Sequence, residues 1–287
     1  VLNLLPARSF DQGMDYVVSL METNLASRMT EGTVRIFQQA TTLHVVPINL
    51  IGVSISTAAF PRLTERLSEN RIDLFKDELR SVIRAIIWLA LPVAIITYFT
   101  RGYVVSFISH RGNSLMAGLL GVFAVAILFR CLYHILARSF YAQQDTKTPL
   151  YISIVAISLN VFLAIWFTFS LRYGAYGLAV AQAIVAIVEV VILFTMMEMR
   201  TPGVLNKYFW QGILRMASAA GFMSIICYFM VHWLPFEAGA RSLYEAVPKF
   251  ILIVLVSLST YLMFSRLLQI KESEPVMRKL RKVFFRA

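Results

Sequence analysis

Long apolar stretches separated by short polar connections fill nearly the whole chain. About 20 apolar residues suffice to cross the hydrocarbon core of a bilayer as a helix. The stretches are too long and continuous for the alternating strands of an outer-membrane barrel. The pattern therefore predicts an all-α polytopic transmembrane helix bundle of about eight spans. The predicted spans are 9–27, 34–60, 82–100, 115–138, 149–170, 174–197, 209–233 and 247–266.

Two segments of this pattern are amphipathic rather than uniformly apolar. Charged side chains such as Asp11, Asp15 and Glu22 interrupt the first stretch, which fits a surface helix about as well as a span. In the connection 61–84, leucine and phenylalanine recur near helical spacing among charges. This connection is predicted to lie along the membrane surface as a helix.

Composition supports a membrane protein and gives no support for an enzyme. Hydrophobic residues make up 58% and charged residues 15% of the chain, against about 45–50% and about 25% in soluble domains. No phosphate-binding loop, nucleophile elbow or kinase-like set of motifs is present, and the four histidines are scattered. We therefore expect a transporter with no cofactor and no metal site.

Charge predicts the orientation of the chain in the membrane. Most of the 27 Lys and Arg residues lie in alternate connections, at 61–84, 138–147 and 200–215, and in the tail after 266. Positive loops stay cytoplasmic, so both termini are predicted to be cytoplasmic. The net charge of +11 is then mainly a topology signal, and binding to nucleic acid is the poorer explanation.

Polar side chains inside the predicted spans are candidate functional residues. A charge at the centre of a membrane helix costs about 2.5–3.5 kcal/mol on insertion scales, and such residues usually mark a pathway. Gln182 and Glu189 are seven residues apart and share a helix face, and Arg130 and His134 are one turn apart. The candidates are Glu22, His44, Arg130, His134, Asn160, Gln182 and Glu189.

Each candidate also has a purely structural interpretation. Arg130 and His134 can extend to the cytoplasmic interface. Asn160 and Gln182 can form hydrogen bonds between helices, and His44 can be a packing residue. The glutamates are harder to explain in this way, because an isolated carboxylate in a membrane needs a partner or a cation.

Several short motifs in the chain have a specific pattern. They are the segments 51–63, 107–112 and 174–178 and, most specific, Arg138-Ser-Phe-Tyr-Ala-Gln-Gln-Asp-Thr-Lys-Thr-Pro149. These motifs resemble those of the MurJ (MviN) family of lipid II flippases, in register. In the last of these segments, Thr148 is suited to cap the next helix and Pro149 to its first position. The resemblance covers essentially all 287 residues.

The resemblance implies helices seven to fourteen of a fourteen-helix flippase in the multidrug/oligosaccharidyl-lipid/polysaccharide exporter superfamily. Residues 1–200 would form a six-helix C-terminal lobe with a MATE-like fold. Residues 201–268 would add two helices that form a groove for the lipid tail, and residues 269–287 a basic amphipathic cytoplasmic tail. Since the chain opens with Val1 rather than Met, an N-terminal lobe is expected to be missing.

The implied function is movement of lipid II, the undecaprenyl-pyrophosphate-linked peptidoglycan precursor, from the cytoplasmic to the outer leaflet. The implied location is the bacterial plasma (inner) membrane. Two lobes would rock around a cationic cavity, driven by membrane potential or by a coupled monovalent cation. The alternatives are an exporter of another polyprenyl-linked glycan or small solute, and a non-transporting cell-wall scaffold. Besides lipid II, the expected partners are membrane lipids and the missing lobe.

The resemblance also suggests roles for individual residues. Thr42 and Val45 stand where the family often has an arginine and an acidic residue. Thr42, Arg130 and His134 are the candidates for substrate binding. Glu22, Asn160 and Gln182 are the candidates for a cation site, although Ala164 replaces an aspartate found in some members.

Overall fold

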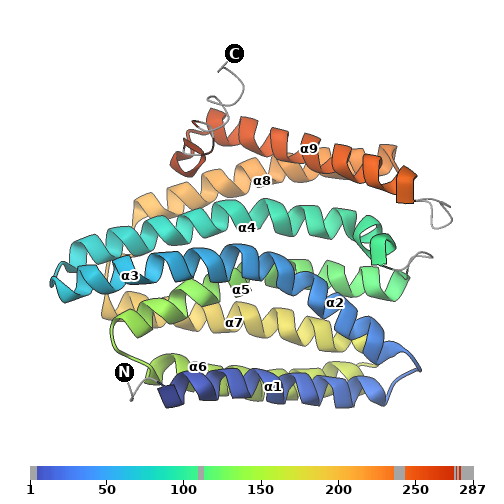
Figure 1. Cartoon of the computed structure of the whole chain (residues 1–287), viewed down its shortest axis with the longest axis horizontal. Coiled ribbons are helices and arrows are strands. Elements are labelled where there is room, and N and C mark those ends of the chain that lie inside the picture. The colour runs from blue at the N-terminus through green and yellow to red at the C-terminus, as the bar shows by residue number, and fades with distance from the viewer. Residues whose placement is uncertain (1–4, 109–112, 236–242, 275, 277, 279–287) are drawn as a thin grey trace.

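The computed structural model describes residues 5–108, 113–235, 243–274, 276 and 278, without the side chains of 5–15 and 243–245. Every regular element in this part is helical, and the helices lie side by side in alternating directions (Figure 1). The helices are α1 (Leu5–Ser27), α2 (Thr33–Pro47), η1 (Ile48–Val53), α3 (Ser54–Ser68), α4 (Ile72–Ile108), α5 (Ser114–Ala142), α6 (Lys147–Ile165), η2 (Trp166–Ser170), α7 (Ala175–Arg200), α8 (Lys207–Trp233), α9 (Leu243–Leu267) and η3 (Lys271–Ser273).

The described helices confirm an all-α membrane bundle. Seven helical stretches are long and apolar enough to cross a membrane, and they contain the second to eighth predicted spans apart from residues near their ends. The first predicted span forms α1, which is not among the seven. It runs beside α6 and also contacts α2, so it belongs to the bundle.

The second span is one continuous helical stretch with an irregular centre. Pro47 ends α2, and the π-helix η1 follows it directly, since proline removes a backbone donor and disturbs the hydrogen-bond ladder. Within η1, an ideal Cβ on Gly52 would lie 2.7 Å from Cα of Cys131. The absence of a side chain at Gly52 therefore lets this stretch approach the backbone of α5.

The prediction of a surface helix between residues 61 and 84 is wrong. Helix α3 extends to Ser68, and α4 begins at Ile72, so the connection is a tight hairpin between two long helices. Leu63, Phe75 and Leu79 are fully buried. The amphipathic pattern was read correctly, but its apolar face packs against neighbouring helices rather than against lipid.

Two groups of helices lie around α4 and α5. Helices α5, α6 and α7 pack together with α1 and α2, while α8 and α9 pair with each other on α4 (Figure 1). The division of the chain at residue 200 into a lobe and an added pair stays a prediction. Most of the tail predicted at 269–287 lies outside the described residues, and its described start forms η3.

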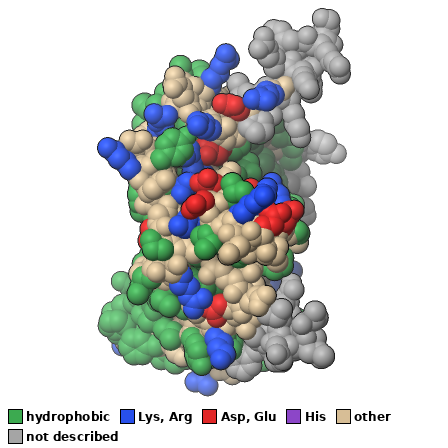
Figure 2. Space-filling view, turned by 90° about the vertical axis from the view of Figure 1, so that its left-hand side faces the viewer, with side chains coloured by type: hydrophobic (Ala, Val, Ile, Leu, Met, Phe, Trp, Pro, Cys, Tyr) green, Lys and Arg blue, Asp and Glu red, His purple; other side chains and the backbone are tan. Residues whose placement is uncertain are grey.

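One end of the bundle gathers the connections that the charge pattern placed together. The α3–α4, α5–α6 and α7–α8 connections lie at this end, as do the start of α1 and the end of α9 (Figure 1). Figure 2 shows this end face, where Lys and Arg side chains mix with Asp and Glu. The connections predicted to lie on one side of the membrane are thus found together at one end of the bundle.

Candidate functional site

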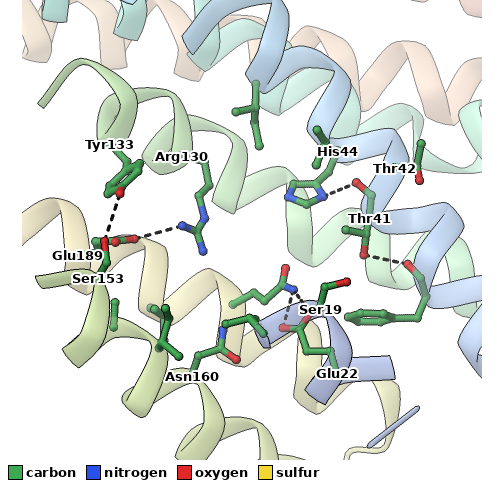
Figure 3. Close-up of a pocket in the computed structure, with 18 of the residues that line it drawn as sticks. Ser19, Glu22, Thr41, Thr42, His44, Arg130, Tyr133, Ser153, Asn160 and Glu189 are labelled. Carbon is green, nitrogen blue, oxygen red and sulfur yellow. Dashed lines mark hydrogen bonds and ion pairs between the residues drawn. The ribbon is translucent and has the colours of Figure 1, made fainter. Parts of the chain in front are cut away.

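A cavity of about 610 Å³ lies among α1, the α2–η1 stretch, α5, α6 and α7. We call it the central cavity. All eight polar residues singled out from the sequence line it, although they come from five different helical stretches (Figure 3). They are Glu22, Thr42, His44, Arg130, His134, Asn160, Gln182 and Glu189. Their convergence identifies this cavity as the candidate functional site.

Arg130 and Glu189 form an ion pair across the cavity wall. Nη1 of Arg130 on α5 lies 3.1 Å from Oε2 of Glu189 on α7. The glutamate side chain is only 4% exposed, whereas that of the arginine is 30% exposed. Arg130 therefore points into the bundle toward its partner (Figure 3), and the interpretation that it extends to the membrane surface does not hold.

Glu22 and Gln182 join α1 to α7. Nε2 of Gln182 donates to both carboxylate oxygens of Glu22, at 2.7 Å each. The interpretation of Gln182 as an interhelical hydrogen-bond donor is therefore confirmed, and Glu22 has a partner although it is buried. One amide group uses only part of the acceptor capacity of a carboxylate.

Asn160 adds a second oxygen acceptor to this region. Its side chain on α6 is buried, and its Oδ1 atom has no hydrogen-bond partner among the described residues. A buried amide oxygen without a partner costs free energy. Oxygen atoms of this kind are the ligands that hard cations prefer, and Asn160 lines the central cavity together with Glu22 and Gln182.

His44 and Thr42 both make local contacts on α2. The His44 ring stacks on Phe123 at a centroid distance of 4.6 Å, and its Nδ1 lies 2.8 Å from the Thr41 carbonyl oxygen. These contacts support the packing interpretation of His44. Thr42 is exposed in the cavity and donates its hydroxyl to the carbonyl of Gln38. No charge therefore stands where the related family often carries arginine.

His134 lines the same cavity, with its ring edge-on to that of Tyr133 at a centroid distance of 5.6 Å. Tyr133 in turn lies within 3.3 Å of the Ser153 hydroxyl (Figure 3). Tyr133, Ser153, Gln38 and Thr41 all line the cavity, and sequence reasoning missed them. Tyr133 is three residues after Arg130, so helical spacing could have found it. Tyr133, Ser153 and Thr41 gave no signal because only charged and amide side chains were weighed. Gln38 was overlooked although its amide lies inside a predicted span.

The charge balance of the described wall favours cations over anions. It contains two carboxylates, Glu22 and Glu189, but only one arginine, which is already paired. With both carboxylates ionised and both imidazoles neutral, the described wall would carry one negative charge in excess. The described wall alone therefore does not supply the fixed positive charge that a pyrophosphate group needs.

The α5–α6 connection is fixed by Asp145 rather than by the predicted Thr148 cap. The Asp145 carboxylate accepts the backbone N–H groups of Lys147 and Thr148, at 3.0 Å each. Helix α6 already begins at Lys147, so Pro149 is its third residue. The prediction failed because the Asp145 carboxylate, one position before the helix N-cap, satisfies two free N–H groups and also suits the positive end of the helix dipole.

Arg200 at the end of α7 completes this connection. Its Nη1 lies 2.5 Å from the Asp145 carboxylate, and its Nη2 donates to the Thr148 hydroxyl at 3.1 Å. Burial alone would raise the pKa of Asp145, but the hydrogen bonds from Thr148 and Lys147 and the charge of Arg200 hold this pKa below its usual value. We call this set the α5–α6–α7 latch.

Comparison with known proteins gives a consistent result. The family model described as "Lipid II flippase MurJ" matches residues 1–247. A probable lipid II flippase MurJ of Thermotoga maritima is 24% identical over 269 residues, which cover 92% of this chain and 52% of that protein. The corresponding protein of Haemophilus influenzae is 29% identical over 212 residues, covering 67% and 39%. The chain spans about half the length of the curated relatives it matches.

Solved structures agree on the fold. A lipid II flippase MurJ in an inward closed conformation matches with a TM-score of 0.71 at 20% identity, over 90% of this chain and 52% of that one. A multidrug resistance MATE family transporter of the MOP superfamily, in an outward-facing conformation, matches with a TM-score of 0.59 at 11% identity, over 96% and 66%. The predicted MATE-like flippase fold is therefore confirmed.

Proposed function

The chain belongs to the lipid II flippase MurJ family, and on that premise we propose that it contributes the C-terminal part of a lipid II flippase. Family membership and seven apolar helices support a multi-pass inner-membrane protein. The proposed activity is movement of lipid II from the cytoplasmic to the outer leaflet by alternating access. One observation carries it: polar side chains from five helical stretches converge on one cavity inside a membrane bundle.

The proposed orientation places the end shown in Figure 2 in the cytoplasm. Basic residues gather in the connections at this end, as the positive-inside rule requires. Residues 1–200 would act as the C-terminal lobe, and α8 and α9 as the added pair beside it. The headgroup of lipid II would enter the central cavity from this end.

A second lobe would supply the opposite wall of the central cavity. The apolar side chains of Leu20, Val46 and Leu50 on α1 and the α2–η1 stretch are between 51% and 71% exposed. The described wall has more carboxylate than cationic groups, so we propose that the opposing N-terminal lobe provides most of the charge for pyrophosphate. Arg130 and His134 would add contacts from this side, with Thr42 as a neutral hydrogen-bonding group.

We further propose that Glu22, Asn160 and Gln182 hold a monovalent cation coupled to transport. The buried carboxylate and the unpartnered Oδ1 of Asn160 supply oxygen ligands. Replacement of Glu22 by Gln removes the charge but keeps the size of the side chain. We expect E22Q to lose any dependence of transport on sodium or potassium, while T23A, altered at a neighbouring cavity residue, keeps it. Unchanged ion dependence in E22Q would remove the cation proposal.

The test of the proposed function is a flipping assay with the full-length protein in proteoliposomes. Fluorescent lipid II in the inner leaflet should become accessible to an impermeant quencher only when the protein is present. The variant E189Q should slow this movement, because it removes the charge of Glu189 and so weakens the ion pair that positions Arg130. Transport of another polyprenyl-linked glycan or of a small solute instead of lipid II would favour the exporter alternative. The low positive charge of the described cavity wall points to such a substrate only if that substrate lacks a pyrophosphate group. No movement of any of these substrates would favour a scaffold.

A further inference from the structure

A second cavity, of about 420 Å³, lies between α4, α8 and the segment that follows α9. We call it the peripheral cavity. Its α8 residues lie in the first turns of that helix, toward the end of the bundle that Figure 2 shows to be rich in Lys and Arg. Its lining residues are Arg84, Tyr208, Gln211, Gly212, Arg215, Gln269, Lys271 and Glu274. We propose that it binds the phosphate group of an anionic phospholipid headgroup.

Arg84 forms the fixed base of the peripheral cavity. Its side chain is 7% exposed, and its guanidinium makes a two-pronged contact with Glu272, with Nε at 2.6 Å and Nη2 at 3.1 Å. Gly212 makes room for it, since an ideal Cβ there would lie 2.5 Å from Cζ of Arg84. The guanidinium thus lies close to the backbone of α8 at Gly212, and its contacts with Glu272 connect α4 to the segment after α9.

Lys271 and Arg215 are two further cations at the peripheral cavity, and both have N–H groups available for a ligand. Lys271 and Arg84 lie over the ring of Tyr208, at 5.2 and 5.1 Å from its centroid. Arg215 is exposed and makes no ion pair or hydrogen bond within the part of the chain that the structure describes. An ammonium and a guanidinium that face one cavity are suited to share the oxygens of a phosphate group.

The charge balance is opposite to that of the central cavity. Arg84, Arg215 and Lys271 face two carboxylates, of which Glu272 is paired with Arg84 and Glu274 also contacts Arg278 at 3.4 Å. One positive charge therefore remains in excess. The amides of Gln211 and Gln269 add neutral donors at the same opening.

The surroundings favour a lipid over a soluble phosphate ester. Trp210, Leu214 and Leu267 beside the cavity are 57%, 69% and 64% exposed. Tryptophan is enriched at the membrane–water interface, and the leucines offer apolar surface along which acyl chains can lie. A headgroup held by Arg215 and Lys271 would leave its chains in the bilayer beside α8 and α9. This proposal does not depend on which substrate the central cavity carries.

The test is a binding titration with the full-length protein in neutral detergent. Dihexanoyl-phosphatidylglycerol is the probe, and dihexanoyl-phosphatidylcholine and glycerol 3-phosphate are the comparison ligands. The variants are R215Q, K271Q and their combination, all at exposed positions that should leave folding intact. The matched control is K207Q, which removes an exposed cation from the same end of α8 outside the cavity lining.

We expect the phosphatidylglycerol lipid to bind more tightly than the phosphatidylcholine lipid. Each single cavity variant should weaken binding about fivefold and the double variant roughly 25-fold, from about 1 kcal/mol per cation near a membrane surface. K207Q should bind as the unaltered protein does. If glycerol 3-phosphate competes as strongly as the phosphatidylglycerol lipid, the cavity binds phosphate but the acyl chains add nothing. The ligand would then be a soluble phosphate ester and not a phospholipid. Equal losses in K207Q and the cavity variants, or equal binding of both lipids, would overturn the proposal.

Discussion

The central and peripheral cavities use the same residue types in opposite ways. In the central cavity, Arg130 and Glu22 each have a buried or partly buried partner on α7, and carboxylates outnumber the arginine. In the peripheral cavity, Arg215 is exposed and without a partner among the described residues, and cations are in excess. A polar group deep in a membrane protein is costly unless a neighbour or a ligand satisfies it, whereas one at the interface can be hydrated until a ligand binds.

Helix α7 is the common element of the central contacts. Gln182 on this helix holds Glu22 of α1, Glu189 holds Arg130 of α5, and Arg200 at its end holds Asp145 of the α5–α6 connection. Any displacement of α7 relative to its neighbours therefore breaks contacts at three levels of the bundle. We infer that these polar pairs set the geometry of the cavity, while the peripheral cations have little influence on it.

The largest effect is expected from breaking the central ion pair. Removal of Glu189 in E189A leaves a partly buried Arg130 without its partner, which typically costs about 3–5 kcal/mol. Thermal unfolding of the protein in detergent, followed by intrinsic fluorescence, measures this change. The double variant R130M/E189L should recover much of the stability, since it removes both charges at once. An E189A protein as stable as the unaltered one would show that the pair contributes little to the central cavity.

The α5–α6–α7 latch should give an intermediate effect that depends on pH. D145A loses both the helix cap and the ion pair and should lower stability by about 1–2 kcal/mol. D145N keeps a capping oxygen but not the charge, and should lose less. The lowered pKa of Asp145 means that its charged form is favoured in the folded state.

The sign of the pH effect follows from this pKa. The stabilisation by Asp145 is fully present above the unfolded pKa of about 3.9 and is lost as pH falls through the folded value. The difference between the unaltered protein and D145N should therefore stay constant at neutral pH and shrink below about pH 4. A difference that grows on acidification would contradict this account of the latch.

The smallest effect on stability is expected at the peripheral cavity. R215Q removes an exposed cation without a described partner, and surface changes of this kind usually stay within about 0.5 kcal/mol. The same thermal unfolding measurement should show no shift beyond this range, while lipid binding changes. A large loss of stability in R215Q would mean that Arg215 is part of the structure and would remove the contrast between the two cavities.

Much of the architecture could be predicted from the sequence, because membrane helices are set by length and hydropathy. The same reasoning placed Gln182 and Glu189 on one face, and the structure finds both at one cavity. It could not predict the partner of either residue. The spacing of two residues shows that they share a helix face, but it does not show which other helix packs against that face. The α3–α4 hairpin was misread for a related reason: an amphipathic pattern such as that of Leu63 and Phe75 does not show whether its apolar face meets lipid or protein.

The latch shows the same limit at short range. The motif around residues 138–149 was recognised, but Thr148 was assigned the capping role that Asp145 performs. The partner that makes Asp145 decisive is Arg200, which is 55 positions further along the chain. Local sequence preferences therefore identified the turn but not the contact that fixes it.

The most direct test of the central claim is photo-crosslinking of lipid II to the full-length protein in membranes. A photoreactive amino acid replaces Thr42, which is exposed in the central cavity, or Val191, which is exposed on α7 and does not line that cavity. If the central cavity receives the lipid II headgroup, the position 42 variant should capture the headgroup and the position 191 variant should not. Equal capture at both positions, or capture at position 191 alone, would contradict the assignment of the central cavity as the substrate site.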